Sequence, residues 1–310
     1  MRIVFMGTPD FAVPCLEALV QAGYDVIAAV TQTDKPKGRG GQMTFPPVKE
    51  TALKYNIPVL QPKRARDEEF LQTMRDLNPD VAIVVAYGKI LPQALLDIPK
   101  HGCINVHASL LPKYRGAAPI QWAVIDGEEK SGVTTMQMDA GLDTGDMLVV
   151  KELTLDPKET GGSLFDKLSA LGAEALLETL EQLKAGTLQP VKQGETTTAY
   201  ASMLEKQMGH IDFTKSAVEI ERLIRGLNPW PSAYTYLDGK TLKVWEADVV
   251  EQDVKDAQAG TVLGVQKDCF LVACGTDVLA VKELQLEGKK RMNAGDFLRG
   301  YNLEVGKLLG

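Results

Sequence analysis

Short apolar runs rich in valine and isoleucine alternate with helical patterns through the first half of this 310-residue chain. Such runs are typical of strands buried on both faces, and parallel neighbours in a sheet need a crossover, usually a helix, between them. The alternation therefore predicts an α/β domain with a doubly wound, mostly parallel sheet. The expected strands are Ile3–Met6, Val26–Val30, Val81–Ala86, Cys103–His107 and Val133–Met138, and the expected helices are Phe11–Gln21, Pro46–Tyr55, Glu68–Leu77 and Gly161–Leu183.

The pattern changes after Gly186, where the last of these helices is expected to end. Residues 187–201 are polar, rich in threonine and without a helical period, which is typical of an extended linker. Beyond them, short apolar segments separated by Gly or Asp turns indicate a small β-barrel. We therefore expect a first domain at 1–186, a linker at 187–205 and a smaller second domain at 206–310. The second domain is expected to hold strands Ala233–Leu237, Leu242–Val250, Gly260–Val265, Phe270–Ala273 and Val278–Leu286, with helices at Ala217–Arg225 and Ala294–Arg299.

Charge, hydropathy and cysteine usage exclude several classes of protein. The formal net charge of −7 argues against a general affinity for nucleic acids. No apolar run is long enough to predict a membrane span, and the first residues resemble a buried strand and not a signal peptide, so we expect a cytoplasmic protein. The cysteines stand singly among apolar neighbours and no Cys or His pair has zinc-site spacing, which predicts reduced core thiols and no metal; they lie at positions 15, 103, 269 and 274.

The segment Gly102–Gly116 carries the strongest indication of chemistry. Asn105 and His107 are two residues apart in an expected strand, so their side chains share one face. An amide donor beside an imidazole at the carboxyl end of such a strand can form an oxyanion site. Asp143, in a loop with two glycines, adds a carboxylate that would stabilise the protonated imidazole. Spacing alone equally allows an interior, hydrogen-bonded histidine and an aspartate that only shapes a turn.

Three further segments each allow a functional and a structural interpretation. The turn Gly7–Phe11 could bind an anion at a helix N-terminus, or Thr8 or Asp10 could simply cap that helix; it lacks the glycine spacing of a dinucleotide site, so NAD is not expected. The turn Leu110–Gly116 combines an aromatic ring with two cations, as an anion pocket or a solvated turn would. The apolar stretch Val84–Pro92 could form the floor of a pocket for a flat heterocycle or belong to the core.

A glycine-rich segment near the N-terminus is expected to be irregular. Gly38–Gly41 follow Asp34–Lys37, and this mixture of glycine, proline and basic residues predicts an exposed, mobile loop.

Together these motifs resemble those of the folate-dependent formyltransferases. The resemblance extends over essentially the whole chain and includes Gly7–Phe11, Lys37–Gly40, Asn105, His107, Ser109–Pro112, Arg115–Gln121, Met138–Gly145 and Asn228–Pro231. It implies a Rossmann-like catalytic domain followed by an OB-like barrel that contacts tRNA. It also implies transfer of the formyl group of 10-formyltetrahydrofolate to the α-amine of methionine carried by initiator tRNA.

The resemblance also assigns roles to individual residues. Asn105 and His107 would stabilise the oxyanion, while Asp143 would hold and polarise the imidazole and assist proton removal from the amine. The family's folate site would comprise Tyr87, Gly88, Ile90, Leu91, Ser109, Leu110, Leu111, Pro112, Asp139 and Leu142. For tRNA, cations of the early loop and of the second domain are expected to face phosphates, namely Lys35, Lys37, Arg39, Arg222, Arg225, Lys289, Lys290 and Arg291.

The charge distribution is compatible with tRNA contacts from the second domain. Residues 206–310 carry 14 basic and 15 acidic side chains, whereas residues 1–205 carry 20 and 26. We expect a monomer without membrane attachment or an obligatory protein partner. The alternatives are a formyltransferase acting on an amino-sugar nucleotide, the hydrolase unit of a formyltetrahydrofolate dehydrogenase, and a non-catalytic RNA-binding protein.

Overall fold

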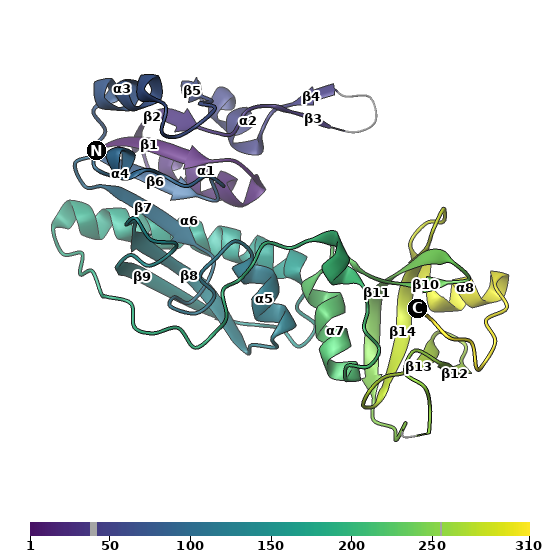
Figure 1. Ribbon diagram of the computed structural model, residues 1–310. Helices are drawn as coiled ribbons and strands as arrows, with labels where there is room; N and C mark the ends of the chain where they lie inside the picture. The colour runs from purple at the N-terminus through teal and green to yellow at the C-terminus, as the bar shows by residue number, and fades with distance from the viewer. Residues whose placement is uncertain (38–41, 255) are drawn as a thin grey trace. The chain divides into compact units, whose positions relative to one another are not determined.

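The computed structural model describes residues 1–37, 42–254 and 256–310, and these form two compact units (Figure 1). The first unit comprises Met1–Pro119, Lys130–Thr154 and Phe165–Ala201, and the second comprises Ile120–Glu129, Leu155–Leu164 and Ser202–Gly310. The expected linker therefore packs largely with the first unit. Two short segments that we expected in the first domain, 120–129 and 155–164, instead pack with the second unit.

The described part of the first unit is built on a seven-stranded sheet with the order β5-β2-β1-β6-β7-β8-β9. Pairing is parallel from β5 to β7, whereas β8 and β9 are antiparallel to their neighbours. The doubly wound, mostly parallel sheet is thus confirmed. The strands are β1 (Arg2–Gly7), β2 (Asp25–Val30), β5 (Val59–Leu60), β6 (Val81–Val85), β7 (Cys103–His107), β8 (Lys130–Gln137) and β9 (Met147–Thr154).

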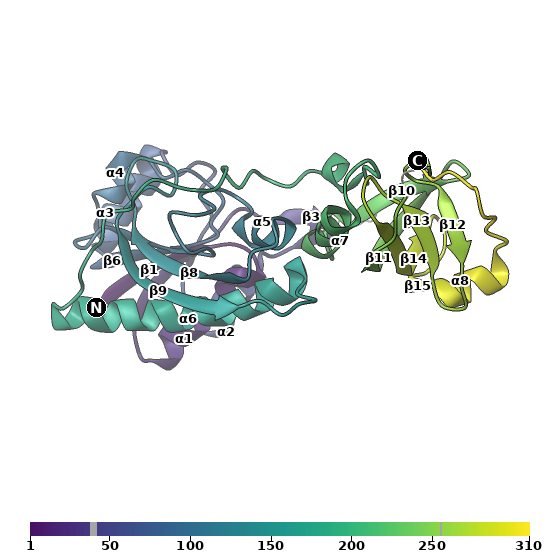
Figure 2. The same ribbon diagram turned by 90° about the horizontal axis from the view of Figure 1, so that it is seen from below.

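Helices cover the sheet on both sides, as Figure 2 shows. One side carries α3 (Glu68–Leu77) and α4 (Gln93–Leu96), whose apolar side chains share a core with β1, β2 and β6. The other carries α1 (Val13–Gln21), α2 (Pro47–Lys54) and α6 (Gly161–Ala185). The approach of α6 is close, since a Cβ on Gly172 would lie 3.1 Å from Val106 of β7. Because side chains alternate along a strand, Asn105 and His107 point to the opposite side from Val106.

The residues on either side of the early glycine-rich segment are more regular than we expected. Lys35–Lys37 form strand β3, which pairs antiparallel with β4 (Gln42–Thr44). The prediction of an irregular loop was wrong for these residues, because Thr44 and Lys35 pair across the hairpin and the Thr44 hydroxyl also donates to the Lys35 carbonyl at 3.1 Å. Gly38–Gly41, including Arg39, lie outside the described residues.

The second unit contains a sheet of antiparallel strands, in the order β10-β11-β14-β13-β12 with β15 paired to β14. Their inward-facing residues form one apolar core together with α7, which starts at a capping box formed by Ser216 and Glu219. The expected succession of strands is confirmed, and the strands pair antiparallel. The elements are α5 (Pro119–Ile125), α7 (Ala217–Gly226), β10 (Ala233–Leu237), β11 (Lys240–Val250), β12 (Val262–Val265), β13 (Phe270–Ala273), β14 (Val278–Leu286), β15 (Met292–Asn293) and α8 (Ala294–Gly300).

The turn after β1 also differs from expectation. A 3-10 turn, Asp10–Ala12, precedes α1, and within the described chain no side chain caps it. The Thr8 hydroxyl instead donates to the Tyr87 carbonyl at 3.2 Å and accepts from the backbone N–H of Gln32 at 3.3 Å. Thr8 therefore ties together the ends of three neighbouring strands, which explains why it does not cap the helix.

The cysteines and the hydropathy of the helices agree with the sequence-based expectations in the residues that the structure describes. All four cysteines are free and buried, which confirms that they are core thiols. Burial raises the pKa of Cys15, Cys103 and Cys274 to about 12 in each case. Within residues 1–37, 42–254 and 256–310, no helix is long and apolar enough to cross a membrane.

Candidate active site

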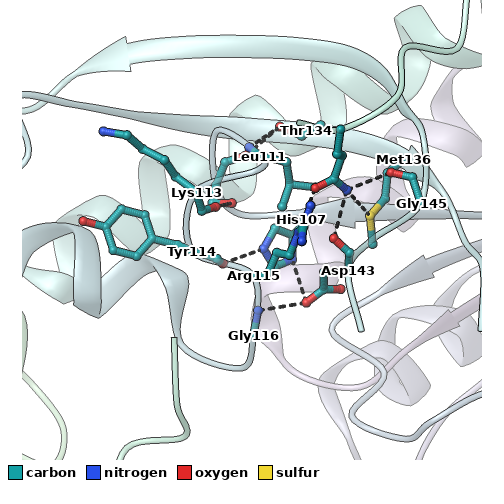
Figure 3. Close-up of polar contacts among 12 residues, drawn as sticks. His107, Leu111, Lys113, Tyr114, Arg115, Gly116, Thr134, Met136, Asp143 and Gly145 are labelled. Carbon is teal, nitrogen blue, oxygen red and sulfur yellow. Dashed lines mark hydrogen bonds and ion pairs between the residues drawn. The ribbon is translucent and has the colours of Figure 1, made fainter. Parts of the chain in front are cut away.

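His107, the last residue of β7, is held between two acceptors (Figure 3). Its Nε2 lies 3.0 Å from the Tyr114 carbonyl oxygen, and its Nδ1 lies 3.8 Å from Oδ2 of Asp143. Because a carbonyl oxygen can only accept, Nε2 carries a proton. The side chain is 7% exposed, so little water competes for these contacts. A second proton, on Nδ1, would face the carboxylate, and the charged ring would then have an acceptor on each side.

Asp143 comes from the loop between β8 and β9, and its backbone adopts the left-handed conformation with φ of 56°. β8 runs antiparallel to β7, so this loop starts beside the first residues of β7 and must fold back over the sheet to reach His107. The same Oδ2 that faces His107 accepts the backbone N–H of Gly116 at 2.9 Å. Asp143 thereby links its own loop to the segment after β7.

Asn105 lies on the same side of the sheet as His107, two residues earlier in β7. It pairs with Val84 of β6 and Met136 of β8, so neighbouring strands support its backbone on both sides. The side chain is half-buried. The structure therefore brings together the three residues singled out from spacing, with an amide donor and an imidazole on one strand face and a carboxylate brought to them by a loop.

The segment after β7 is stabilised by its own polar side chains. Ser109 is buried and donates from Oγ to the Lys113 carbonyl at 2.7 Å. The Thr134 hydroxyl donates to the Ser109 carbonyl at 2.7 Å and accepts the N–H of Leu111 at 3.1 Å. These contacts shape the turn that presents the Tyr114 carbonyl to His107.

The residues expected to bind folate divide into two groups. Tyr87, Leu91, Ser109 and Leu111 are buried, and Tyr87 and Leu91 belong to the core beneath α3 and α4. By contrast, the apolar side chains of Ile90 and Leu142 are 79% and 56% exposed. The remaining members are exposed or half-buried: Gly88, Leu110, Pro112 and Asp139.

The segment after α6 contributes contacts that our sequence analysis did not anticipate. The Thr198 hydroxyl accepts the backbone N–H of Tyr114 at 2.8 Å, and Ala201 exchanges backbone hydrogen bonds with Arg115 and Ala117 at 2.8 and 2.7 Å. The Gln193 side chain contacts both the Asp143 loop and Arg115. A polar, threonine-rich composition is equally typical of a solvated linker, so no local signal distinguishes these residues.

The cations expected to contact tRNA lie in different environments. Lys35 is exposed and donates from Nζ to Gln32 at 3.1 Å, and Lys37 lies in β3. Lys289, Lys290 and Arg291 are exposed in the turn between β14 and β15, where the Arg291 guanidinium also pairs with Glu283 and lies 4.7 Å above the ring of Trp245.

The two arginines of α7 are engaged inside the second unit. Arg225 donates to Glu221 and to the Glu159 carbonyl, both at 2.7 Å, and its side chain is 17% exposed. Arg222 packs against Gly127, where an added Cβ would lie 2.2 Å from the guanidinium carbon. Both side chains hold the segments 120–129 and 155–164 against α7. We therefore do not include them in a surface for phosphates.

No group of three or more His, Cys, Asp or Glu side chains in the described parts of the chain could hold a metal ion.

Two family models match this chain: formyl transferase over residues 1–180, and the formyl transferase C-terminal domain over residues 203–302. The chain therefore belongs to the formyl transferase family. Among its relatives, the methionyl-tRNA formyltransferase of Lachnospira eligens is 60% identical over the full length of both chains. The methionyl-tRNA formyltransferase of Geobacter metallireducens is 54% identical, over 100% of this chain and 99% of the relative.

Solved structures share the fold at low sequence identity. WlaRD, a sugar 3N-formyl transferase crystallised with dTDP and 5-N-formyl-THF, is 18% identical with a TM-score of 0.68, over 94% of this chain and 99% of that one. HypX from Aquifex aeolicus, solved in complex with tetrahydrofolic acid, is 16% identical with a TM-score of 0.65, over 100% of this chain and 50% of that one. These similarities support the fold alone.

Proposed function

We propose that the protein transfers the formyl group of 10-formyltetrahydrofolate to the α-amino group of methionyl initiator tRNA. The observation that carries this proposal is the meeting of Asn105, His107 and Asp143 at the end of β7 in a chain whose full-length relatives are named methionyl-tRNA formyltransferases. Because initiator tRNA is used in translation, we expect the activity to be cytoplasmic. We also expect the chain to act as a monomer.

Asn105, His107 and Asp143, called the trio below, provide the groups that formyl transfer requires of a protein. Negative charge develops on the formyl oxygen as the amine attacks, and donors fixed in advance around that oxygen lower the barrier. Asn105 would provide a neutral amide donor, and the protonated ring of His107 would provide positive charge. Asp143 stabilises that charge, and its carboxylate can take the proton that the amine loses and return it to the leaving nitrogen.

The exposed apolar side chains beside the trio fit a flat folate ring. Ile90 follows β6, the neighbour of β7, and Leu142 precedes Asp143 in the loop that folds back to His107. We propose that these two exposed apolar side chains form part of the surface that the folate ring covers, since ligand sites are lined mainly by apolar side chains. When bound there, the folate would supply the activated formyl group. Buried Ser109, Leu111, Tyr87 and Leu91 would support these loops from beneath.

For tRNA, we propose contacts from the hairpin that carries Lys35 and Lys37 and from the exposed turn at Lys289, Lys290 and Arg291. Phosphate contacts of this kind position a nucleic acid without reading its sequence. Arg39 belongs to the same expected set but lies outside the described residues.

A parallel transfer assay tests the proposal. Labelled 10-formyltetrahydrofolate is supplied with methionyl initiator tRNA, methionyl elongator tRNA, free methionine and an amino-sugar nucleotide in separate reactions. We expect rapid transfer to the initiator tRNA only. Label that moves only to the sugar nucleotide would overturn the proposal, and absence of folate binding by calorimetry would favour a non-catalytic RNA-binding protein.

A further inference from the structure

The segment 191–201, which follows α6, is bound to both loops that hold His107. On one side it contacts the segment after β7, through Thr198 to the Tyr114 N–H and through Ala201 to Arg115 and Ala117. On the other side, Val191 and Met147 exchange two backbone hydrogen bonds of 2.8 Å at the end of the Asp143 loop. A segment whose composition is typical of a linker therefore supports both loops that contact His107.

Gln193 is the side chain in this segment that reaches both loops at once. Its Nε2 donates to the carbonyl oxygens of Asp143 at 2.9 Å and Gly145 at 2.7 Å, while its Oε1 accepts from Nε of Arg115 at 2.9 Å. Both amide hydrogens and the amide oxygen thus have protein partners. Nε2 also lies 3.9 Å from Sδ of Met136. Arg115 also donates from Nη2 to the neighbouring Gly194 carbonyl at 3.3 Å.

The nitrogen and the oxygen of the Gln193 amide each bind one of the two segments that contact His107. The Asp143 carbonyl is fixed by Gln193 while the Asp143 side chain faces Nδ1, so the hydrogen bond controls where the carboxylate is presented. Arg115 follows Tyr114, whose carbonyl accepts from Nε2, and precedes Gly116, whose N–H binds the carboxylate. A single half-buried amide therefore connects the two backbone segments that orient the imidazole.

We propose that Gln193 is a positioning residue for formyl transfer, which acts through Asp143 and Arg115 by fixing the two loops that hold His107. This inference rests on the function proposed above. Gln193 touches neither amine nor formyl group in this assignment. Its effect comes from the geometry of the groups that do, and small misplacements of such groups are costly: about 1 Å can lower a rate by about a hundredfold.

Two substitutions of Gln193 test the donors and the acceptor of its amide separately. Gln193→Ala removes both donors and the acceptor. Gln193→Glu keeps an acceptor for Arg115 but turns a carboxylate toward the carbonyls of Asp143 and Gly145. In steady-state assays we expect each to lower kcat by about ten- to a hundredfold with KM for folate and for tRNA nearly unchanged. If Arg115 and Gln193 act as a unit, adding Arg115→Ala to Gln193→Ala costs little more than either change alone.

Gln189→Ala is the matched control, because Gln189 is an exposed glutamine two residues before the segment 191–201. We expect wild-type kinetics for this variant. A wild-type protein that does not formylate methionyl initiator tRNA contradicts the proposed function. A wild-type protein that does, together with Gln193→Ala and Gln193→Glu at wild-type kcat, contradicts only the positioning role. Equal loss of kcat in Gln189→Ala would also overturn it.

A measurement without turnover tests the same inference. The chain has three histidines, so ring ¹⁵N spectra of histidine-labelled protein can be assigned with His101→Gln and His210→Gln. We expect the His107 signal to show a proton on Nε2 in the wild type, and to shift or broaden in Gln193→Ala while the signals of His101 and His210 stay in place. An unchanged His107 signal in a folded Gln193→Ala protein would rule out the positioning role.

Discussion

Asp143 binds Gly116 through the same carboxylate oxygen that faces His107, with Oδ2 2.9 Å from the Gly116 nitrogen and 3.8 Å from Nδ1 of His107. One oxygen thus joins a loop from β8 to the segment after β7 and presents charge to the imidazole. The hydrogen bond to Gly116 fixes the carboxylate in place, and the longer distance to Nδ1 exceeds that of a direct hydrogen bond. The His107 ring therefore faces both loops, and the hydrogen bond between Asp143 and Gly116 joins these loops to each other.

Removal of either the Asn105 amide or the His107 ring should lower turnover sharply. Asn105→Ala deletes the amide, and His107→Ala deletes the imidazole. The Asn105 backbone is paired with a strand on each side, and the His107 backbone is paired with Thr134 of β8. We expect each to reduce kcat by about 10²–10³-fold, or roughly 3–4 kcal/mol, as for loss of one oxyanion donor. Single-turnover formylation measures this, with calorimetry to show that folate binding is largely kept. Near-normal rates in either variant would contradict its assigned role.

Asp143→Asn tests the charge without changing the shape of the side chain. The amide oxygen can still accept the Gly116 N–H, but the negative charge beside His107 and the capacity to accept a proton are lost. We expect kcat to fall by about 10²–10⁴-fold, the range for loss of a positioned acid–base group.

Glu195→Gln provides the control for this charge removal, since Glu195 is an exposed carboxylate in the segment after α6. Its kcat should match the wild type. If Asp143→Asn and Glu195→Gln behave alike, the carboxylate of Asp143 has no special role.

Gly145→Ala should move the Asp143 loop by steric pressure alone. A Cβ at this position would lie 1.7 Å from the Gln137 carbonyl oxygen. Backbone atoms must move to relieve this steric clash. We expect a loss of stability of about 1–3 kcal/mol, as in overpacked cores, and a fall in kcat because Asp143 shifts. Thermal unfolding and single-turnover kinetics check both effects. Gly300→Ala, where no atom lies within 4 Å of the added Cβ, should change neither.

The core of the first sheet could be predicted because its strands have a purely local signal. β1 and β6 are buried almost throughout, so they consist of continuous apolar runs that composition alone reveals. β9 was missed because, at the edge of the sheet, it is mostly half-buried or exposed and includes Lys151 and Glu152. The β3–β4 hairpin was missed because its pairing overrides an unfavourable local composition.

The site was predictable only where its residues are close in sequence. Asn105 and His107 follow from the two-residue period of a strand. The approach of Asp143 depends on a loop that folds back against β8, and its carbonyl is held by Gln193, 50 positions away. Such a contact belongs to the tertiary structure, so no local pattern in 187–201 could have indicated it.

Lys289 and Lys290 should contribute to tRNA affinity through charge. Each lysine that neutralises a phosphate releases a counterion, so affinity falls with salt by roughly one unit of log–log slope per contact. We expect the double change Lys289→Ala and Lys290→Ala to weaken binding of methionyl initiator tRNA and to reduce the magnitude of the slope by about one to two units. Filter binding from low to moderate salt measures both. An unchanged slope would place these lysines outside the tRNA surface.

Asp248 should make the second unit sensitive to acid. Its carboxylate lies 2.8 Å from Nζ of Lys158 and 3.1 Å from Nζ of Lys282, and the hydrogen bond from Lys158, followed by that from Lys282, lowers its pKa below the ordinary value of 3.8. The unfolded chain then binds a proton at a higher pH than the folded one. The stabilisation is complete above about pH 4 and is lost as the pH falls through the lower folded pKa.

Thermal unfolding of the wild type and of Asp248→Asn across this range tests the acid effect. Near pH 7 the variant should be less stable, by about 1 kcal/mol or less, because Asp248 is 39% exposed and solvent screens the pair. As the pH falls below about 4 the difference should shrink, and it should vanish once the folded carboxyl is protonated, since both proteins then carry an uncharged group at this position. A stability difference between wild type and Asp248→Asn that stays constant from pH 7 to pH 3 would contradict the assigned effect of Lys158 and Lys282 on this carboxylate.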